Sequence, residues 1–443
     1  MRDEDIFQQV VDAARARGVS EVEAIIAGGS HALTRFANNT IHQNVAERAV
    51  HVSVRAILEG RTARASTNRI DREGIADVVE QAIAITRSSE PDPELLPLAE
   101  PGPHPEVKRY FPSTAETTPD ERARAVASAI EAVRSEGQTA AGIYSTGDSY
   151  FALLNSRGVK ASYRETMARF SITAMAADSS GWAKASGCSK DEIDPLALAQ
   201  AAARKAAQSA KPRELPPGRY TVILEPAAVL DLTGQMFGDF GATAIRDGRS
   251  FLTDRIGKQL FGDNVTIHDD VTHPLQSGAP FDGEGVPRRD LKLVERGVVR
   301  EIAYCRQAAA VAGVTPTGHG FPLPNEYGEA PTNVVIFGGN ATLDQMVAST
   351  DRGVLVTRLW YIRDVDPYEQ IFTGMTRDGT FLVEGGQVVA GVRNFRFNEG
   401  LIEMLSNVEA LSGPVRASGE EAPDMVVPAM KVSDFNFTEV TRF

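Results

Sequence analysis

Cysteine is scarce in this chain: its 443 residues include only two, Cys188 and Cys305. Two cysteines so far apart form no disulfide framework, and such usage is typical of proteins in a reducing compartment. No stretch approaches the roughly 18 to 20 uninterrupted apolar residues of a membrane-spanning helix. The first residues, MRDEDIFQQVVDAARARG, are charged and amphipathic and lack the apolar run of an export signal. We therefore expect a cytoplasmic protein.

Basic residues are fewer than acidic ones. The chain has 46 Lys and Arg against 59 Asp and Glu, a formal net charge of -13, and no long basic run. Proteins that bind nucleic acid broadly usually present a basic face, so this class is disfavoured. The apolar fraction of 42% and charged fraction of 24% are ordinary for a globular protein. The length is enough for two domains.

The periodicities predict an α+β fold in two domains, residues 1–215 and 216–443. Helical faces recur near residues 4–17, from Asp71 and from Thr118, where Thr-Pro-Asp-Glu is a strong helix start. Alternating segments predict a hairpin at Glu59-Gly60 and an antiparallel sheet in the first domain. Residues 88–112 contain seven prolines and predict an extended connector inside that domain. Short strands and turns predict a β-rich, partly barrel-like second domain.

One segment carries most of the functional information. Residues 225–239 read EPAAVLDLTGQMFGD, with Pro226 placed to start a helix. This segment resembles the zinc helix of the TldD/TldE (PmbA) metallopeptidase family, whose TldD branch has His-Glu-x-x-Gly-His. In this chain the two histidines align with Leu230 and Gln235 and the glutamate with Asp231, while Gly234 is kept. A catalytic zinc needs about three protein ligands, and Leu offers none.

The resemblance extends over most of the chain. It includes the N-terminal block TRFANNTIHQN and the block IHDDVTHPLQSGAPFDGEGV, and GVLVTRLWYIRDVDPYEQIFTGMTRDGTFLVE and NFRFNE resemble the TldE branch in particular. Where the TldD branch has a zinc-binding Cys, this chain has Thr373 to Arg377, with no Cys, His or carboxylate before Asp378. Both expected ligand regions therefore lack ligands.

The resemblance implies a division of labour between two subunits. In the family, TldD supplies the zinc and TldE pairs with it in one cytoplasmic metalloprotease that cleaves unfolded or short peptides. Its roles include peptide-antibiotic maturation and antitoxin degradation, and an older label is modulator of DNA gyrase. We expect this chain to be the non-catalytic subunit of such a heterodimer, with no catalytic residue and no zinc of its own. Without a metal-bound water, Asp231 is interpreted as a solvated helix residue.

Two other hypotheses remain open. The chain is a self-sufficient homodimeric peptide-binding protein, or it is a peptidase whose zinc is held elsewhere, for instance by His268 and His273. Their five-residue separation, followed by Pro274, instead favours a turn in which Asp side chains accept backbone N–H groups.

Four residues are candidates for substrate or interface contacts. His319 lies between two glycines and is expected in a surface loop. Trp360 and Tyr361 stand between Arg358 and Arg363 in a strand-like run. Aromatic residues beside arginine are common in interface hot spots and equally common in ordinary cores, so both interpretations stay open for Arg358, Trp360 and Tyr361.

Overall fold

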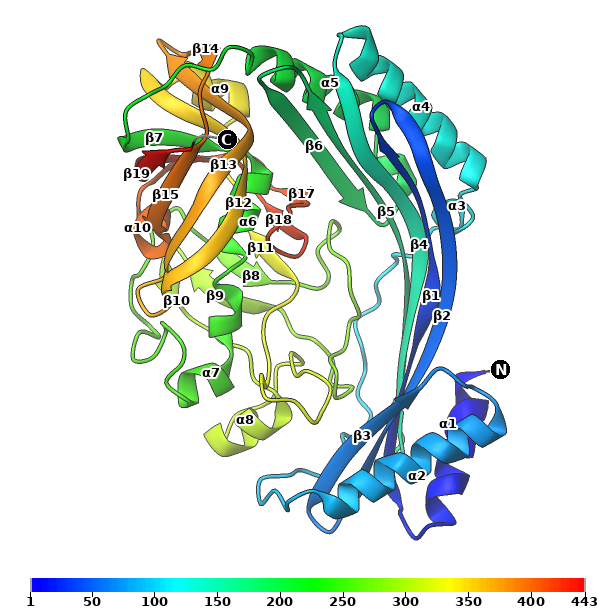
Figure 1. Ribbon diagram of the computed structural model, residues 1–443. Coiled ribbons are helices and arrows are strands. Elements are labelled where there is room, and N and C mark those ends of the chain that lie inside the picture. The colour runs from blue at the N-terminus through cyan, green and yellow to red at the C-terminus, as the bar shows by residue number, and fades with distance from the viewer. Residues whose placement is uncertain (1, 442–443) are drawn as a thin grey trace.

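The computed structural model describes residues 2–441 and has a large antiparallel sheet in its first half (Figure 1). The strand order is β3-β2-β1-β4-β5-β6. Its strands are β1 (Glu21–Ala37), β2 (Thr40–Leu58), β3 (Arg61–Thr67), β4 (Thr139–Asn155), β5 (Lys160–Met175) and β6 (Ser180–Gly187). The predicted hairpin is confirmed: Glu59 and Gly60 connect β2 to β3, both with positive φ, as a tight hairpin turn requires.

Helices cover both ends of this sheet. They are α1 (Asp3–Arg15), α2 (Arg72–Ser88), α3 (Pro112–Ala115), α4 (Pro119–Ser135), η1 (Lys190–Glu192) and α5 (Pro195–Gln208). The capping box predicted at Thr118 is present. The Glu121 N–H donates to the Thr118 hydroxyl, and the Thr118 N–H donates to the Glu121 carboxylate. The apolar faces of α1 and α2 pack on one end of the sheet, and those of α4 and α5 on the other.

The proline-rich connector follows α2 and has neither helix nor strand between residues 89 and 111, apart from one bridge at Arg109. It packs along the sheet, where the Asn155 side chain donates to the Ala99 carbonyl at 2.8 Å. At its far end Arg109 donates to the carbonyls of Gly278 (2.7 Å) and Val271. The connector therefore helps to join the two halves of the chain.

The second half contains two further sheets. The larger has the order β12-β7-β19-β15-β13-β14, and because β12 also pairs with β13, five of its strands close into a barrel, as the β-rich pattern predicted. These strands are β7 (Gly218–Leu224), β12 (Arg352–Asp366), β13 (Ile371–Glu384), β14 (Gln387–Gly391), β15 (Phe395–Gly400) and β19 (Met430–Val440), with β16 (Val408–Leu411) paired to β19. The other sheet comprises β8 (Ile267–Asp269), β9 (Leu291–Glu295), β10 (Val298–Val299), β11 (Val334–Ile336), β17 (Val415–Ala417) and β18 (Met425–Val427).

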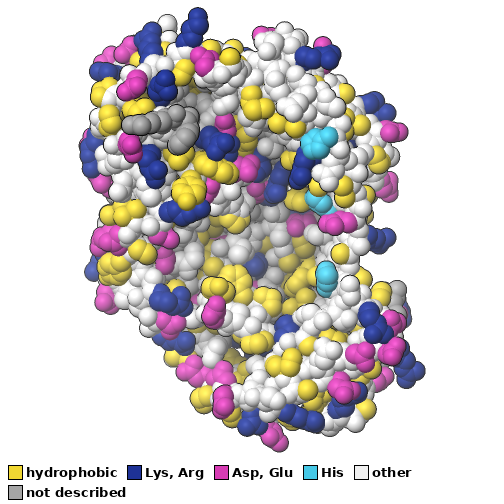
Figure 2. Space-filling model, viewed as in Figure 1, with side chains coloured by type: hydrophobic (Ala, Val, Ile, Leu, Met, Phe, Trp, Pro, Cys, Tyr) yellow, Lys and Arg dark blue, Asp and Glu magenta, His cyan; other side chains and the backbone are white. Residues whose placement is uncertain are grey.

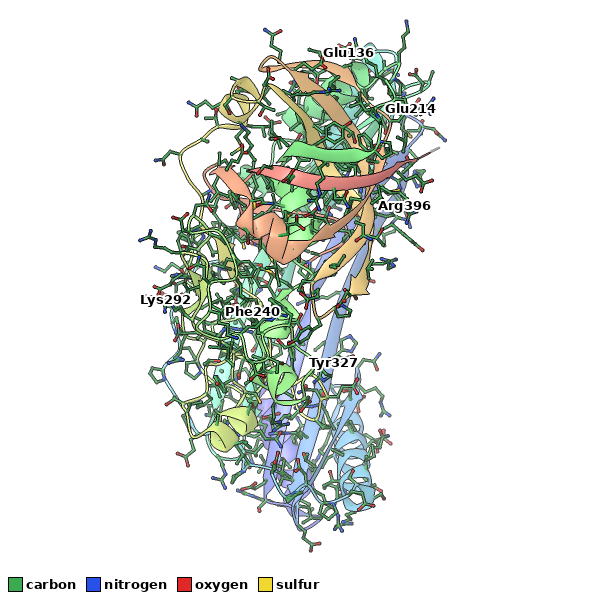
Figure 3. The ribbon with its side chains drawn as sticks, turned by 90° about the vertical axis from the view of Figure 1, so that its left-hand side faces the viewer. Glu136, Glu214, Phe240, Lys292, Tyr327 and Arg396 are labelled. Atoms are coloured by element: carbon green, nitrogen blue, oxygen red, sulfur yellow. The ribbon has the colours of Figure 1, made fainter. Side chains whose placement is uncertain are left out.

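Short helices complete the second half and enclose its core. They are α6 (Pro226–Thr233), η2 (Phe237–Phe240), α7 (Ala242–Arg246), α8 (Arg306–Ala312), α9 (Leu343–Ala348) and α10 (Leu401–Ser406). Figure 3 shows Phe240 inside this half and Lys292 at its outer surface. Within residues 2–441, no helix is long and apolar enough to cross a membrane.

The two halves face each other across a hollow. In Figure 1 the long strands lie on the right, the second half lies on the left, and β17 and β18 approach β6. Figure 2 shows the surface indented between them. The first sheet draws all its strands from before residue 188 and the other two sheets draw theirs from after residue 217. The exact boundary at residue 215 stays a prediction.

Candidate functional site

The segment resembling a zinc helix is a short helix, α6, that follows β7 and begins at Pro226 as expected. Gly234 caps it, and a Cβ there would overlap the side chain of Ala422. We define residues 418–424, between β17 and β18, as the covering loop. Gly234 is therefore needed because the covering loop lies directly against the end of α6.

Leu230 and Asp231 are both fully buried. Leu230 belongs to the main hydrophobic core of the second half. The Asp231 Oδ1 accepts hydrogen bonds from the backbone N–H groups of Glu420 (2.9 Å) and Glu421 (3.0 Å). The interpretation of Asp231 as a solvated residue is therefore wrong. The reason is that the covering loop, almost 190 residues further along the chain, closes over a side chain that α6 alone would expose.

Close approach of the covering loop depends on Gly419. A Cβ at this position would overlap Asp231 Oδ1. The loop is held from the other side by Lys184 of β6, which donates to the Gly419 carbonyl and forms an ion pair with Glu420 at 3.0 Å. The Gln235 amide donates to the carbonyls of Asp231 (3.0 Å) and Glu421 (3.1 Å). Gln235, the position of the second family histidine, thus fastens the loop.

The donor set at this helix does not fit a zinc ion. Leu230 offers no lone pair. One oxygen of Asp231 already accepts hydrogen bonds from two backbone amides, and the Gln235 amide already donates to the carbonyls of Asp231 and Glu421. The first carboxylate after the second ligand region, Asp378, is paired with Arg358. Across residues 2–441 no group of three or more His, Cys, Asp or Glu side chains is arranged to hold a metal.

Burial changes the acidity of Asp231. Desolvation raises the pKa of its carboxyl to about 6, although the two loop amides favour the charged form. Its Oδ2 is buried and has no hydrogen-bond partner among the described residues. Burial likewise raises the pKa of Asp239 to about 6 and of Glu284 and Glu399 to about 7.

These shifts predict a loss of stability as pH rises. A carboxyl whose folded-state pKa is raised binds more protons in the folded state, so its contribution is fully present below about pH 4 and disappears as pH rises through about 6. For Asp231 the difference amounts to roughly 2–3 kcal/mol. In urea titrations, Asp231→Asn should reduce the fall in unfolding free energy between pH 4 and pH 7. The exposed control Asp263→Asn should leave that fall unchanged, and an unchanged fall in Asp231→Asn would contradict this assignment.

The histidine candidate is buried as well. His319 is 1% exposed, with Nε2 3.0 Å from Asp269 Oδ1 and Nδ1 2.9 Å from Thr317 Oγ1. The expected surface loop is therefore wrong, and His319 has no free face for substrate. Its flanking glycines serve close packing, since a Cβ at Gly318 would overlap the Pro287 backbone and one at Gly320 would lie 2.8 Å from Glu284 Oε1.

His268 and His273, the histidines named as alternative zinc ligands, each contact a different group. His268 Nδ1 lies 3.4 Å from Asp290, and His273 Nδ1 accepts the Leu275 N–H at 3.3 Å. Asp270 Oδ1 accepts the Thr272 N–H at 2.8 Å, which confirms the expected hydrogen-bonded turn.

Arg358, Trp360 and Tyr361 lie together on β12 but differ in accessibility. Arg358 is 6% exposed, forms an ion pair with Asp378, and its guanidinium lies 4.9 Å from the Trp182 ring and 5.3 Å from the Trp360 ring. Tyr361 is 50% exposed, and its N–H donates to Glu421 of the covering loop at 2.9 Å. Tyr361 therefore remains available for contacts, whereas Arg358 is occupied within the chain.

The structure also brings together basic residues that no sequence pattern singled out. A cavity of about 490 Å³ lies between the halves, beside the covering loop. Its charged lining consists of Arg169, Lys184, Arg288, Arg416, Glu420 and Asp424. These residues are spread over some 250 positions of the sequence, so no local pattern indicated that they lie together.

Comparison with known proteins agrees with this architecture. Models of the PmbA/TldA metallopeptidase match in three parts: domain 1 at residues 22–86, the central domain at 113–210 and the C-terminal domain at 217–439. The metalloprotease PmbA of Escherichia coli O157:H7 is 24% identical over 396 residues, which cover 85% of this chain and 84% of that protein.

Two solved structures have the same fold. A putative modulator of a DNA gyrase from Thermotoga maritima MSB8 has a TM-score of 0.88 at 20% identity and covers 99% of this chain and 100% of its own. TldE from Thermococcus kodakarensis has the same TM-score and identity and covers 98% of this chain and 100% of its own. Since the family models together span most of the sequence, the chain belongs to the PmbA/TldD metallopeptidase family.

Proposed function

We propose that this chain is a TldE-type, metal-free subunit that pairs with a zinc-bearing TldD-type peptidase in the cytoplasm. The observation that carries the proposal is the closure of the family's zinc helix by the covering loop. Leu230 is in the core, Asp231 accepts hydrogen bonds from two loop amides, and Gln235 donates to a loop carbonyl. This arrangement leaves no position for a metal-bound water, so the hydrolytic chemistry would come from the partner.

The role of this subunit is to shape a shared channel for unfolded or short peptides. Two features support it. The first sheet ends in edge strands β3 and β6, to which an extended peptide could add. The cavity beside β6 gives such a peptide a second point of contact. Peptide-antibiotic maturation and antitoxin degradation are the processes that the family resemblance suggests.

Metal analysis and peptidase assays of the purified chain, alone and mixed with a TldD-type chain from the same host, test the proposal. We expect the lone chain to contain substoichiometric zinc and to leave an unstructured peptide intact. The mixture should cleave that peptide faster than the TldD-type chain does alone. Stoichiometric zinc together with hydrolysis by the lone chain would overturn the proposal. Peptide binding with no effect on any zinc-bearing chain would instead identify a self-sufficient peptide-binding protein.

Tyr361 provides a more local prediction. It is exposed, stacks under Arg363 (4.3 Å from guanidinium to ring centroid) and lies beside the covering loop. If this surface contacts the TldD-type subunit, Tyr361→Ala should weaken association about 10-fold, the usual scale of an aromatic hot spot. Tyr327 is 66% exposed on a different loop, and Tyr327→Ala should have no effect. Equal affinities of both variants in analytical ultracentrifugation would exclude Tyr361 from the interface.

A further inference from the structure

The cavity between the two halves is positively charged in an acidic protein. Strands β5 and β6 supply Arg169 and Lys184, and the second half supplies Arg288 and Arg416. The lining includes only two carboxylates, Glu420 and Asp424, so it has an excess of two positive charges, while the whole chain has a net charge of -13. A concentration of one sign of charge in a concave site attracts ligands of the opposite sign.

Three of the four cations are already paired. Asp424 Oδ2 accepts from Arg169 at 2.9 Å and from Arg416 at 3.3 Å, and Glu420 pairs with Lys184 at 3.0 Å. The Asp424 side chain is only 9% exposed and also accepts from the hydroxyls of Ser186 and Ser418, both at 2.7 Å. These contacts hold the cavity walls in place before any ligand arrives.

Arg288 has no such acceptor. Its side chain donates no hydrogen bond to any group within residues 2–441, and its Nε and Nη1 are shielded from solvent. The nearby carboxylates of Asp269 and Asp282 interact with its charge. Both carboxylates, however, have other donors. Asp269 accepts from His319 and from the backbone N–H groups of Thr332 and Asn333. Asp282 accepts from the backbone N–H groups of Glu284, Val286 and Gly320.

A guanidinium group has five N–H donors, and burying them without acceptors is costly. The Nε of Arg169, in the same lining, is also buried without an acceptor. Arg288 Nη2, by contrast, is neither hydrogen-bonded to any group within residues 2–441 nor shielded in this way, so it is the donor of that guanidinium that an oxyanion in the cavity can reach. A carboxylate suits this position because its hydrogen bond to the charged arginine is stronger than one between neutral groups.

Part of the wall beside the charges is apolar, although Ser277, Thr332 and Asn333 also line it. Met167, Ala279, Ala422 and Pro423 line the same cavity, which has room for a few peptide residues. We propose that this cavity binds the carboxylate of a peptide, with Arg288 as its principal contact and the apolar wall receiving the adjoining side chain. The peptide as ligand class rests on the proposed function. The covering loop contributes Glu420 and Ala422 to the cavity, so the bound carboxylate lies next to the closed zinc helix.

Fluorescence anisotropy with the purified full chain tests this proposal. The probes are a labelled unstructured peptide with a free C-terminal carboxylate, the same peptide amidated, and an amidated version with one internal Glu. We expect the free acid to bind at least about 10-fold more tightly than the plain amide. The internal-Glu peptide distinguishes a side-chain carboxylate from a terminal one. Equal affinity of all three peptides would overturn the proposal, as would stronger binding of inorganic phosphate alone.

Two variants locate the site. Arg288→Gln should reduce binding of the carboxylate peptide to the level of the plain amide, while its melting temperature shows that it is folded. Arg289→Gln alters the exposed neighbouring arginine and should bind like the unaltered chain. Equal losses in both variants, or none in Arg288→Gln, would exclude the cavity. Neither zinc nor a second subunit is needed for this assay, so its failure is distinguishable from failure of the proposed pairing with a TldD-type chain.

Discussion

Leu230→His, which introduces the residue found in the TldD branch, is expected to destabilise the fold by about 3–5 kcal/mol. Leu230 is fully buried in the main core of the second half. The substitution removes apolar contacts and places imidazole nitrogens where no solvent reaches them. Urea unfolding measures the effect. Leu196→His is the matched control, because Leu196 is 44% exposed on α5 and the change there should cost no more than about 0.5 kcal/mol.

The same argument predicts that restoring both histidines does not restore a metal site. In Leu230→His/Gln235→His, the Asp231 carboxylate would still accept the two loop amides, and Thr373 to Arg377 would still offer no third ligand. Replacing Gln235 also removes a hydrogen bond to the covering loop. We expect substoichiometric zinc by metal analysis after dialysis. A stable double variant with one zinc per chain would contradict the view that the covering loop and core have replaced the metal site.

The sequence predicted features whose causes are local. The Thr118 capping box, the Glu59-Gly60 hairpin and the helix start at Pro226 each depend on neighbouring residues, and the structure has all three. The loss of zinc-ligand residue types at Leu230 and Gln235 was likewise visible from residue identity alone.

The burial of Asp231 and the gathering of distant basic residues around one cavity were not predictable from the sequence in the same way. Asp231 is covered by Glu420 and Glu421, and Arg288 and Arg169 line the same cavity only because β5 lies opposite the second half. No spacing in the sequence encodes such contacts between distant segments. His319 shows the opposite error: its glycines were interpreted as signs of a surface loop, although they permit close packing around a buried hydrogen bond between His319 and Asp269.

Arg358→Met is the second substitution with a large expected effect. The side chains of Arg358 and Asp378 are 7% and 8% exposed, and Asp378 also accepts from Ser180 of β6 at 2.6 Å. Removing the arginine leaves the buried Asp378 carboxylate without its main partner, and such a loss reduces the free energy of unfolding by about 3–5 kcal/mol. Arg363→Met is the control, because the Arg363 side chain is 57% exposed and its loss should cost about 1 kcal/mol or less.

A double-mutant cycle separates the pair from the packing around it. Asp378→Asn added to Arg358→Met removes the unpaired charge, so the double variant should be more stable than Arg358→Met alone. Some loss should persist, because the Arg358 guanidinium also packs 4.9 Å from Trp182 of the first half. If the second substitution restores nothing, the loss in Arg358→Met comes from the contact with Trp182 and not from the unpaired carboxylate. Trp182, which contacts Arg358, and Ser180, which donates to Asp378, both lie on β6, so either contact couples the wall of the carboxylate cavity to the barrel.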